Sequence, residues 1–374
     1  MLNSSLVLKY NKTIMRAKHL ALNNYRNCKN IELDFNNNKT LIIGKNAQGK
    51  TNILESIYFL STLKSPRTSN IKEFVNFDKN NFSAEITIEK SNTEIELGIE
   101  YKLDKPKVLK VNGLKTTSKN YKGVLTTVLF STQDLMLLRG SPQDRRSWLD
   151  SAISQIYPAH DERISKYNKI RVQKNNLLKE PDINLALLDV FNEQLTTVGA
   201  NIIYVRQKFL SELKKYAKTG YLDISKNEEF DLKYSFEEKD LNKIAKALKE
   251  ELEERKFEEI ARHQSCVGPH RDDVYFYLND KDATKFASQG QQRTIVLAIK
   301  LAEIELIKNK NGESPILLLD DVLAELDDLR QNYLLSSISD NTQTIITSVD
   351  TLLFDNEFLR NVTIFKISNG EIIE

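Results

Sequence analysis

A glycine-rich loop near the N-terminus constrains the fold of this chain more than any other feature. The stretch 41–52 reads LIIGKNAQGKTN, in which Gly44, Gly49, Lys50 and Thr51 fit the pattern G-x-x-x-x-G-K-[ST]. Apolar residues before the loop predict a short buried strand, and apolar periodicity after it predicts a helix. A strand, a phosphate-binding loop and a helix in this order predict an α/β fold.

Each part of this loop has a physical role in holding phosphates. The glycines let successive backbone N–H groups point at phosphate oxygens, and the following helix adds its positive dipole end. Lys50 is expected to reach the β- and γ-phosphates, and the Thr51 hydroxyl to bind Mg²⁺. Ala47 stands where related loops often have glycine, so this position needs a negative φ or carries strain. The predicted nucleotide-binding residues of the loop are Gly44, Lys45, Asn46, Ala47, Gln48, Gly49, Lys50, Thr51 and Asn52.

A second motif typical of nucleotide-binding proteins lies far downstream in the sequence. The run 315–321, PILLLDD, reads as a fully buried strand of a parallel sheet that ends in two carboxylates. Asp320 is expected to hold Mg²⁺, and Asp321 to polarise the attacking water. Many strands end in acids, so this pattern is weak alone and becomes strong beside the phosphate-binding loop.

An amphipathic helix is predicted shortly before these acids, in the run 286–307, FASQGQQRTIVLAIKLAEIELI. Ser288 and Gly290 stand at its start, where a hydroxyl and exposed amides make an anion site. The alternative is that Ser288 is a plain N-cap. This candidate site lies more than two hundred residues from Lys50.

Composition narrows the classes of protein. The formal net charge of the 374 residues is +2, so any basic surface must be local. Cys28 and Cys266 lack metal-ligand spacing and indicate a reduced compartment. With no apolar run near the length of a membrane span, we expect a soluble, cytoplasmic protein with no membrane partner. The first fourteen residues precede Met15 and read as a disordered tail or an artefact of start-codon choice.

The middle of the chain changes from strands to helices. The run 16–35 predicts two strands joined by a turn, and further strands are predicted at 82–89, 93–101, 108–111 and 124–130. Ser141, Pro142 and Asp144 are a capping signal, after which the pattern is helical to about Lys218, broken only around Pro181. The run 235–262 predicts one more charged helix.

Four short stretches resemble the motifs of ABC-type ATPases. Ser288–Gln292 resembles their signature motif, and Ala324–Asp327 resembles their D-loop. Phe130–Asp134 is similar to the Q-loop region, with Gln133 as the expected sensor of the metal and the γ-phosphate. Thr347 and Ser348 fall where the switch residue of the H-loop lies, although these ATPases usually have histidine there.

Three longer stretches resemble the RecF family of recombination-repair proteins. They are LALNNYRNCKNIELDF near the start, RGSPQDRRSWLD at 139–150 and GPHRDD at 268–273, in the order of the family. The resemblance covers nearly everything from Met15 onward. The departures are the leader, Ala47, and Thr132-Gln133 where relatives often carry Pro-Glu, which leaves the role of Gln133 open.

The resemblance implies an ABC-type ATPase head built from both ends of the chain, with an inserted helical arm. We expect an extension at 1–14, head parts at 15–111 and 263–374, and the arm at 112–262, whose strand 124–130 and Q-loop region can pack on the head. It also implies roles for particular residues. The expected catalytic residues are Asp321, Lys50 and Gln133, the metal ligands are Thr51, Asp320 and Gln133, and the residues that touch the γ-phosphate of another subunit are Ser288, Gly290 and Gln291.

The function implied by the resemblance is an ATP-driven clamp on DNA. ATP and Mg²⁺ would join two copies face to face on double-stranded and gapped DNA or at single-strand junctions, and hydrolysis would release them. The RecR and RecO proteins would be partners in loading recombinase at gaps, with support of the SOS response. Asp321, shorter than glutamate, fits a weak, DNA-dependent, switch-type ATPase.

Three other functions compete with this one. A structural ATPase of the SMC type needs much longer coiled-coil arms. The nucleotide-binding subunit of a transporter would lack the inserted arm, and an ATPase coupled to a nuclease would carry an acidic metal cluster. The SMC-like alternative is the nearest.

Residues that contact DNA are the hardest to choose. We expect phosphate contacts from basic side chains near the loop and the root of the arm, namely Lys64, Arg67, Lys107, Lys110 and Arg139. A run of charges is more often a solvated face. Arg145 and Arg146 can equally pair with Asp150 or Asp272, and His270 and Arg271 read as structural.

Overall fold

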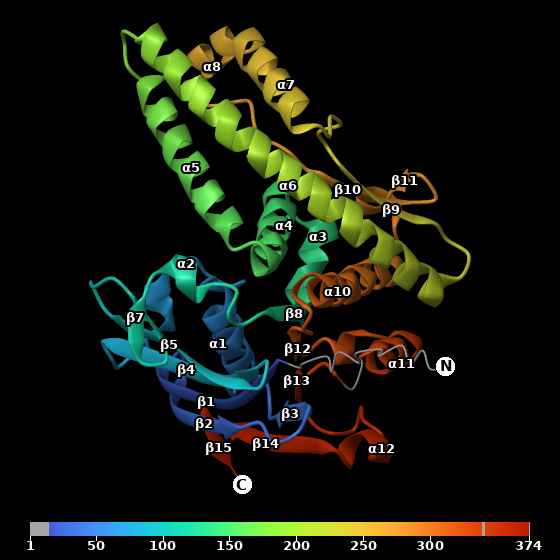
Figure 1. The fold of residues 1–374 in the computed structure, drawn as a ribbon. Helices are drawn as coiled ribbons and strands as arrows, with labels where there is room; N and C mark the ends of the chain where they lie inside the picture. The colour runs from blue at the N-terminus through green and yellow to red at the C-terminus, as the bar shows by residue number, and fades with distance from the viewer. Residues whose placement is uncertain (1–14, 339–340, 374) are drawn as a thin grey trace, which may run out of the picture.

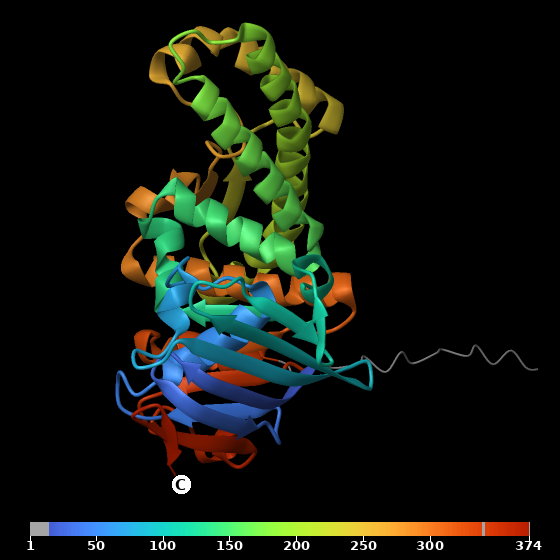
Figure 2. The ribbon, with the colours of Figure 1, turned by 90° about the vertical axis from the view of Figure 1, so that its left-hand side faces the viewer.

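The computed structural model describes residues 15–338 and 341–373, so the predicted extension at 1–14 lies outside the described residues. The first and last parts of the chain, blue and red in Figure 1, form a head of two sheets. The middle of the chain, green and yellow, rises from it as a helical arm. Figure 2 shows the same two parts from the side. The predicted mixed α/β head with an arm-like insertion is confirmed.

A six-stranded sheet forms the centre of the head. Its strands are parallel to their neighbours except for β15, which pairs antiparallel with β14. In spatial order they are β15 (Glu371–Ile373), β14 (Val362–Ser368), β3 (Lys39–Ile43), β13 (Thr344–Ser348), β12 (Ile316–Asp320) and β8 (Thr127–Ser131). The central strand β3 therefore has only C-terminal strands as neighbours.

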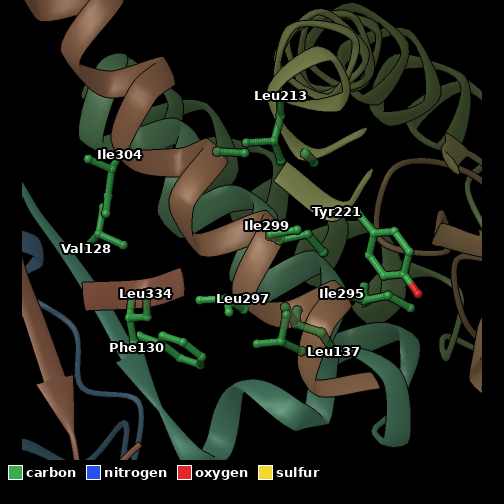
Figure 3. Packing of buried hydrophobic residues seen from close by; sticks show 14 of the residues in the cluster. Val128, Phe130, Leu137, Leu213, Tyr221, Ile295, Leu297, Ile299, Ile304 and Leu334 are labelled. Carbon is green, nitrogen blue, oxygen red and sulfur yellow. The ribbon is translucent and has the colours of Figure 1, made fainter. Parts of the chain in front are cut away.

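Successive residues of these strands face two different hydrophobic cores. In β12, Leu317 and Leu319 join one core, while Ile316 and Leu318 join the other. This is the period of two that a pleated strand imposes, and burial on both faces explains the continuous apolar run before Asp320. Figure 3 shows the first core, where the helix α10 (Gln289–Asn311) packs its isoleucines and leucines against β8 and the arm.

The second core lies between this sheet, the helix α1 (Lys50–Thr62) and an antiparallel sheet. The antiparallel sheet has the order β2 (Cys28–Asp34), β1 (Arg16–Tyr25), β4 (Asn81–Lys90), β5 (Thr93–Lys102), β6 (Val108–Val111) and β7 (Leu114–Thr116). The strands predicted from alternation are confirmed. The shorter helices of the head are η1 (Ile71–Phe74), α2 (Ser118–Tyr121), η2 (Thr132–Leu135), η3 (Leu323–Glu325), α11 (Asp328–Ser337) and α12 (Asn356–Leu359). Two more, α3 (Met136–Arg139) and α9 (Ala283–Phe286), contact each other at the root of the arm.

The arm contains five helices and one small sheet. They are α4 (Pro142–Ile156), α5 (Ala159–Leu177), α6 (Leu185–Ser225), α7 (Leu241–Glu254) and α8 (Lys256–Arg262), with β9 (Phe230–Tyr234), β10 (Val274–Leu278) and β11 (Lys281–Asp282). The capping box at Ser141 and Asp144 is confirmed. None of the described helices is long and apolar enough to cross a membrane.

Two helix predictions for the arm were wrong. The helical run does not break only near Pro181, because α4 ends at Ile156 and α5 begins after Pro158. Proline has no N–H to donate, so the helix cannot continue through it. The run 235–262 is also not one helix. Its first helix starts only at Leu241, and the helical conformation is interrupted at Arg255 before α8 begins. The strand β9, which precedes this run, was not predicted.

The division of the chain into head and arm at residue 112 stays a prediction. That boundary falls in the turn of the hairpin between β6 and β7, and both strands belong to the antiparallel sheet of the head. β8 also pairs along its length with β12. The chain therefore returns to the head twice after residue 112 before the long helices begin.

The stretches RGSPQDRRSWLD and GPHRDD meet at the root of the arm. Arg145 pairs with Asp273 at 2.7 Å in a buried contact, and Arg146 Nη1 donates to the main-chain oxygen of Asp272 at 2.6 Å. The expected pairing of Arg146 with Asp272 thus involves the main-chain oxygen of Asp272. Arg145 pairs with the carboxylate of the next residue, Asp273. These contacts fasten α4 to the segment before β10.

A second buried contact at the root is made by α6. Arg206 holds Asp150 with two hydrogen bonds of 2.8 Å, and His160 lies 2.8 Å from the same carboxylate. Burial alone would raise the pKa of Asp150, but Arg206 and His160 hold that pKa well below its ordinary value. The expected structural role of His270 fits its contacts, because it lies 2.8 Å from the Tyr167 hydroxyl.

The buried carboxyl of Asp272 predicts a pH dependence of stability. Burial raises the pKa of Asp272 to about 6, although its carboxylate accepts a hydrogen bond from the Tyr234 hydroxyl. A folded-state pKa above the unfolded value means that this group stabilises the fold at low pH, and that this contribution is lost as the pH rises from about 4 to 6. We therefore compare the free energy of unfolding of Asp272→Asn with that of the wild type at two pH values. The difference should be about 1–3 kcal/mol more in favour of the variant at pH 7.5 than at pH 4.5.

Urea unfolding of both proteins at the two pH values measures this difference. Asp104→Asn is the matched control, because that carboxylate is exposed and pairs only with Lys72 among its described contacts. An Asp272→Asn variant whose stability differs from the wild type equally at both pH values would contradict the prediction.

Candidate nucleotide-binding site

The carboxyl ends of four parallel strands meet at one edge of the central sheet. They are the ends of β3, β13, β12 and β8, which come from three distant parts of the sequence. Ligands of open α/β sheets bind outside such ends. A cavity of about 550 Å³ lies there, lined by Asn27, Asn46, Ala47, Gln48, Gly49, Lys50, Thr51, Asn52, Leu54, Glu55, Pro66, Arg67, Leu129, Ser131, Thr132, Gln133, Asp320 and Asp321.

The phosphate-binding loop has the strained geometry that its sequence indicated. Gly49 has φ 114 and precedes α1, a conformation that favours glycine. A Cβ at Gly44 would lie 2.4 Å from the main-chain oxygen of Ile367, so the chain passes too close for a side chain. Ala47 has φ 64, which means that the strained alternative is the one adopted.

The C-terminal hairpin supports this loop from outside. The main-chain N–H of Asn369 donates to Gln48 Oε1 at 2.6 Å, and that of Gly370 donates to the Gln48 carbonyl at 2.9 Å. The side chain of Asn27 lies against the other side, where it accepts from Asn52 Nδ2 at 2.7 Å. The loop is thus held in shape by contacts from both ends of the chain.

Lys50 lines the cavity and is almost completely buried. Its ammonium donates to the main-chain oxygens of Gly44 at 2.6 Å and of Lys45 at 3.3 Å. These neutral acceptors leave the positive charge without a carboxylate partner among the described contacts. An anionic phosphate is a stronger partner for this charge than a carbonyl oxygen.

Two hydroxyls converge on the carboxylate of Asp320. Thr51 Oγ1 donates to Asp320 Oδ1 at 3.0 Å, and Thr347 Oγ1 donates to the same oxygen at 2.9 Å. Burial raises the pKa of Asp320, and the two hydroxyls partly offset that effect. A hydroxyl and a carboxylate oxygen at this distance suit Mg²⁺, which takes few protein ligands and keeps its waters and phosphate oxygens. The residues present therefore fit the predicted metal site.

Asp321 lines the cavity from a left-handed backbone conformation. Its φ is 51, which aspartate adopts more readily than most residues other than glycine and asparagine. Its N–H donates to Thr347 Oγ1 at 2.9 Å, so the hydroxyl predicted as the switch residue fixes both acids. The hydrogen bond from its N–H to Thr347 fixes the backbone of Asp321 at the edge of the cavity.

Gln133 reaches the same cavity from the end of β8. The next residue, Asp134, closes a capping box with Ser131 and pairs with the buried Lys300 of α10 at 2.8 Å. The Q-loop region is therefore tied to α10 by an ion pair. The structure brings Gln133 together with Lys50, Thr51, Asp320 and Asp321, as expected.

Ser288, Gly290 and Gln291 lie outside this cavity. Ser288 is exposed and caps α10, where its hydroxyl accepts from the Gln291 N–H at 3.2 Å and its own N–H donates to Gln291 Oε1 at 2.7 Å. Both the plain N-cap and the anion site predicted from sequence are compatible with this geometry. One copy of the chain does not bring this helix start to its own phosphate-binding loop.

Arg67 was predicted as a DNA contact, but its side chain lines the nucleotide cavity. Its Nη1 donates to Asn52 Oδ1 at 2.7 Å and lies 3.6 Å from Glu55 Oε2, and both partners belong to α1. Sequence reasoning missed this role, because Arg67 lies in a polar loop without a pattern. Its spacing after α1 was the only available signal.

Most other predicted DNA contacts have partners inside the molecule. Lys64 pairs with Asp161 at 2.7 Å, and Lys110 pairs with Glu100 at 2.5 Å. Lys107 lies over the ring of Phe59, and burial lowers its pKa. Arg139 Nε donates to Gln292 Oε1 at 2.7 Å, within the stretch that resembles the signature motif. Each of these four side chains therefore has a partner within the chain, and their contact with DNA stays a prediction.

The comparisons with known proteins agree on one family. The model of the RecF/RecN/SMC N terminal domain matches residues 16–372. The DNA replication and repair protein RecF of Bacillus subtilis (strain 168) is 42% identical over 372 residues, which cover 96% of this chain and 100% of that relative.

Solved structures give the same result. A structure of the recombination mediator protein RecF with ATP, in the RecFOR pathway, has a TM-score of 0.89 and 35% identity, covering 96% of this chain and 97% of that chain. The Smc head domain with an extended coiled coil from Pyrococcus furiosus has a TM-score of 0.55 and 15% identity, with 96% of each chain covered. That second likeness is one of fold alone.

Proposed function

This chain belongs to the RecF family of DNA replication and repair proteins, and we propose that it is an ATP-dependent dimer whose nucleotide is enclosed between two copies. One observation carries this proposal. The cavity contains the residues predicted to bind a triphosphate and Mg²⁺, while Ser288, exposed at the start of α10, lies outside it. A second copy, facing the first, would supply that helix start to the γ-phosphate.

The residues of the cavity would divide the work between binding and chemistry. Lys50 would exchange its carbonyl partners for the β- and γ-phosphates, and Arg67 would add a second positive charge. Thr51 and Asp320 would hold Mg²⁺, which neutralises phosphate charge when bound. Asp321 would accept the proton of the attacking water, with Gln133 sensing the γ-phosphate. The shorter side chain of Asp321 supports a weak, switch-type ATPase.

The proposed use of this dimer is a clamp on DNA. Its relatives named as DNA replication and repair proteins support DNA as the ligand, and we propose that this DNA is double-stranded or gapped. RecR and RecO would be its partners in loading recombinase at single-strand gaps, with a contribution to the SOS response. The length of the arm favours this function over that of an SMC-like structural ATPase. The longest helix of the arm, α6, has 41 residues, whereas an SMC-type ATPase needs much longer coiled-coil arms.

A Ser288→Arg variant tests the proposal, because it removes the hydroxyl and crowds the start of α10. We expect the monomer to bind ATP with unchanged affinity and the ATP-dependent dimer to be lost. ATP hydrolysis and stable DNA binding should fall with the dimer, since both need the closed pair. Light scattering with ATP, with ADP and without nucleotide measures association, and a titration with a fluorescent ATP analogue measures binding.

Ser336→Arg, on the exposed side of α11, is the matched control for adding an arginine and should dimerise normally. If Ser288→Arg also dimerised with ATP as the wild type does, Ser288 would be a helix cap only. The enclosed-nucleotide dimer would then have to be abandoned.

A further inference from the structure

The guanidinium of Arg330 joins two segments that both resemble interface motifs. Arg330 lies in the first turn of α11, directly after the stretch that resembles the D-loop. Its Nη1 pairs with the carboxylate of Asp327, the last residue of that stretch, and its Nε donates to Thr294 Oγ1 of α10 at 2.8 Å. Only about a fifth of the arginine side chain is exposed, at 19%.

Thr294 links Arg330 to the stretch that resembles the signature motif. Its side chain is buried, and its hydroxyl donates to the main-chain oxygen of Gly290 at 3.0 Å. One chain of hydrogen bonds therefore runs from Asp327 through Arg330 and Thr294 to Gly290. Gly290 lies two residues after Ser288, in the first turn of α10.

The same arginine also lies directly beside the backbone of Gly290. A Cβ at Gly290 would lie 3.2 Å from Arg330 Nη2, which is too close unless the guanidinium moves. The guanidinium would have to shift by a few tenths of an ångström to admit a Cβ, so Arg330 and the backbone of Gly290 lie in close contact.

The next residue of α11 fixes the rest of the D-loop stretch. Gln331 Nε2 donates to the main-chain oxygens of Leu323 at 2.7 Å and of Leu326 at 2.9 Å. In Figure 1, α11 lies directly below α10, and the two helices are in contact. The D-loop stretch and the start of α10 are thus connected through one short helix.

We propose that Arg330 is a positioning residue that holds the D-loop stretch and the signature stretch in one fixed arrangement. This inference rests on the proposed function, because both stretches would then meet the second copy of the chain together. Segments that are ordered before association lose less conformational freedom when the dimer forms. Arg330 would therefore favour dimerisation without touching the nucleotide of its own chain.

The test compares ATP-dependent dimerisation of the wild type with that of Arg330→Met, which keeps the length of the side chain and removes its donors. We expect the protein concentration at half dimerisation to rise at least about tenfold, which corresponds to about 1.4 kcal/mol. ATP affinity of the monomer should stay within about twofold. Arg330→Lys should show an intermediate loss, since an ammonium cannot pair with Asp327 and Thr294 in the same forked geometry.

Thr294→Val provides a second variant that breaks the connection with a side chain of nearly the same shape, and it decides alone if Arg330→Met does not fold. Arg262→Met is the matched control, because Arg262 pairs with Glu258 at 3.0 Å on the arm helix α8. Normal dimerisation of the two test variants would overturn the inference. The inference would also be overturned if the monomers of these variants lost ATP affinity by the same factor by which their half-dimerisation concentration rose.

The Ser288→Arg variant separates this inference from the function on which it rests. If Ser288→Arg dimerises normally with ATP, the proposed function fails. If Ser288→Arg loses the dimer while Arg330→Met and Thr294→Val keep it, only the role of Arg330 fails.

Discussion

A Lys50→Ala variant is expected to lose ATP binding, with a Kd at least about a hundredfold higher than that of the wild type. A factor of a hundred corresponds to about 2.7 kcal/mol, and a charge-assisted contact to two phosphates in a buried site is worth at least that much. Lys50→Arg keeps the charge in a different shape, so it should retain binding with little hydrolysis. Calorimetric titration with Mg·ATP and a phosphate-release assay measure the two properties.

The loss in Lys50→Ala should not come from unfolding. Among the described residues, the ammonium donates only to two loop carbonyls, so the variant should keep its melting temperature to within a few degrees. Lys246→Ala, at an exposed position of α7 that pairs with Glu250, is the control for removing a lysine and should bind ATP normally. Normal ATP turnover in Lys50→Ala would show that the loop at 44–51 is not the phosphate site.

Asp321→Asn is expected to bind Mg·ATP normally and to hydrolyse it about 10²–10⁴-fold more slowly than the wild type. The amide cannot accept the proton of the attacking water. Asparagine tolerates positive φ at least as well as aspartate does, so the backbone at φ 51 should be unaffected. The variant should therefore accumulate the ATP-bound dimer, which light scattering can follow over time.

Asp320→Asn should behave differently from its neighbour. The Asp320 carboxylate accepts from Thr51 and Thr347 at the predicted metal position, so losing its charge should raise the Mg²⁺ concentration needed for half-maximal ATP binding. Magnesium titrations of both variants distinguish the two roles. If both variants hydrolysed ATP at the wild-type rate, the strand β12 would not be the metal strand.

Those parts of the fold and of the site that depend on short local sequence patterns could be predicted. The loop around Lys50, the strand before Asp320 and the capping box at Ser141 each need particular residue types at fixed spacing, and the structure has all three. These residue types at fixed spacing can be recognised in the sequence itself, although contacts from distant segments complete the shape of the loop.

Features that depend on distant contacts were not predictable in the same way. Arg67 has no motif around it, and only the path of its loop takes it to α1 and the cavity. The pairing of Lys64 with Asp161 joins residues far apart in sequence, as does that of Arg145 with Asp273. A charged residue looks the same in a sequence whether it meets DNA, solvent or a carboxylate of its own chain.

The strand order of the central sheet has a consequence for the synthesis of the protein. β3 pairs only with β13 and β14, and β13 begins about 300 residues after β3 ends. At a translation rate of about 5–20 residues per second, this apolar strand leaves the ribosome about 15–60 s before its first partner exists. Unpaired apolar strands are sites of aggregation, so the nascent chain needs protection during that interval. A chain that ends prematurely between α1 and β13 would contain the complete phosphate-binding loop and still lack both strands that pair with β3.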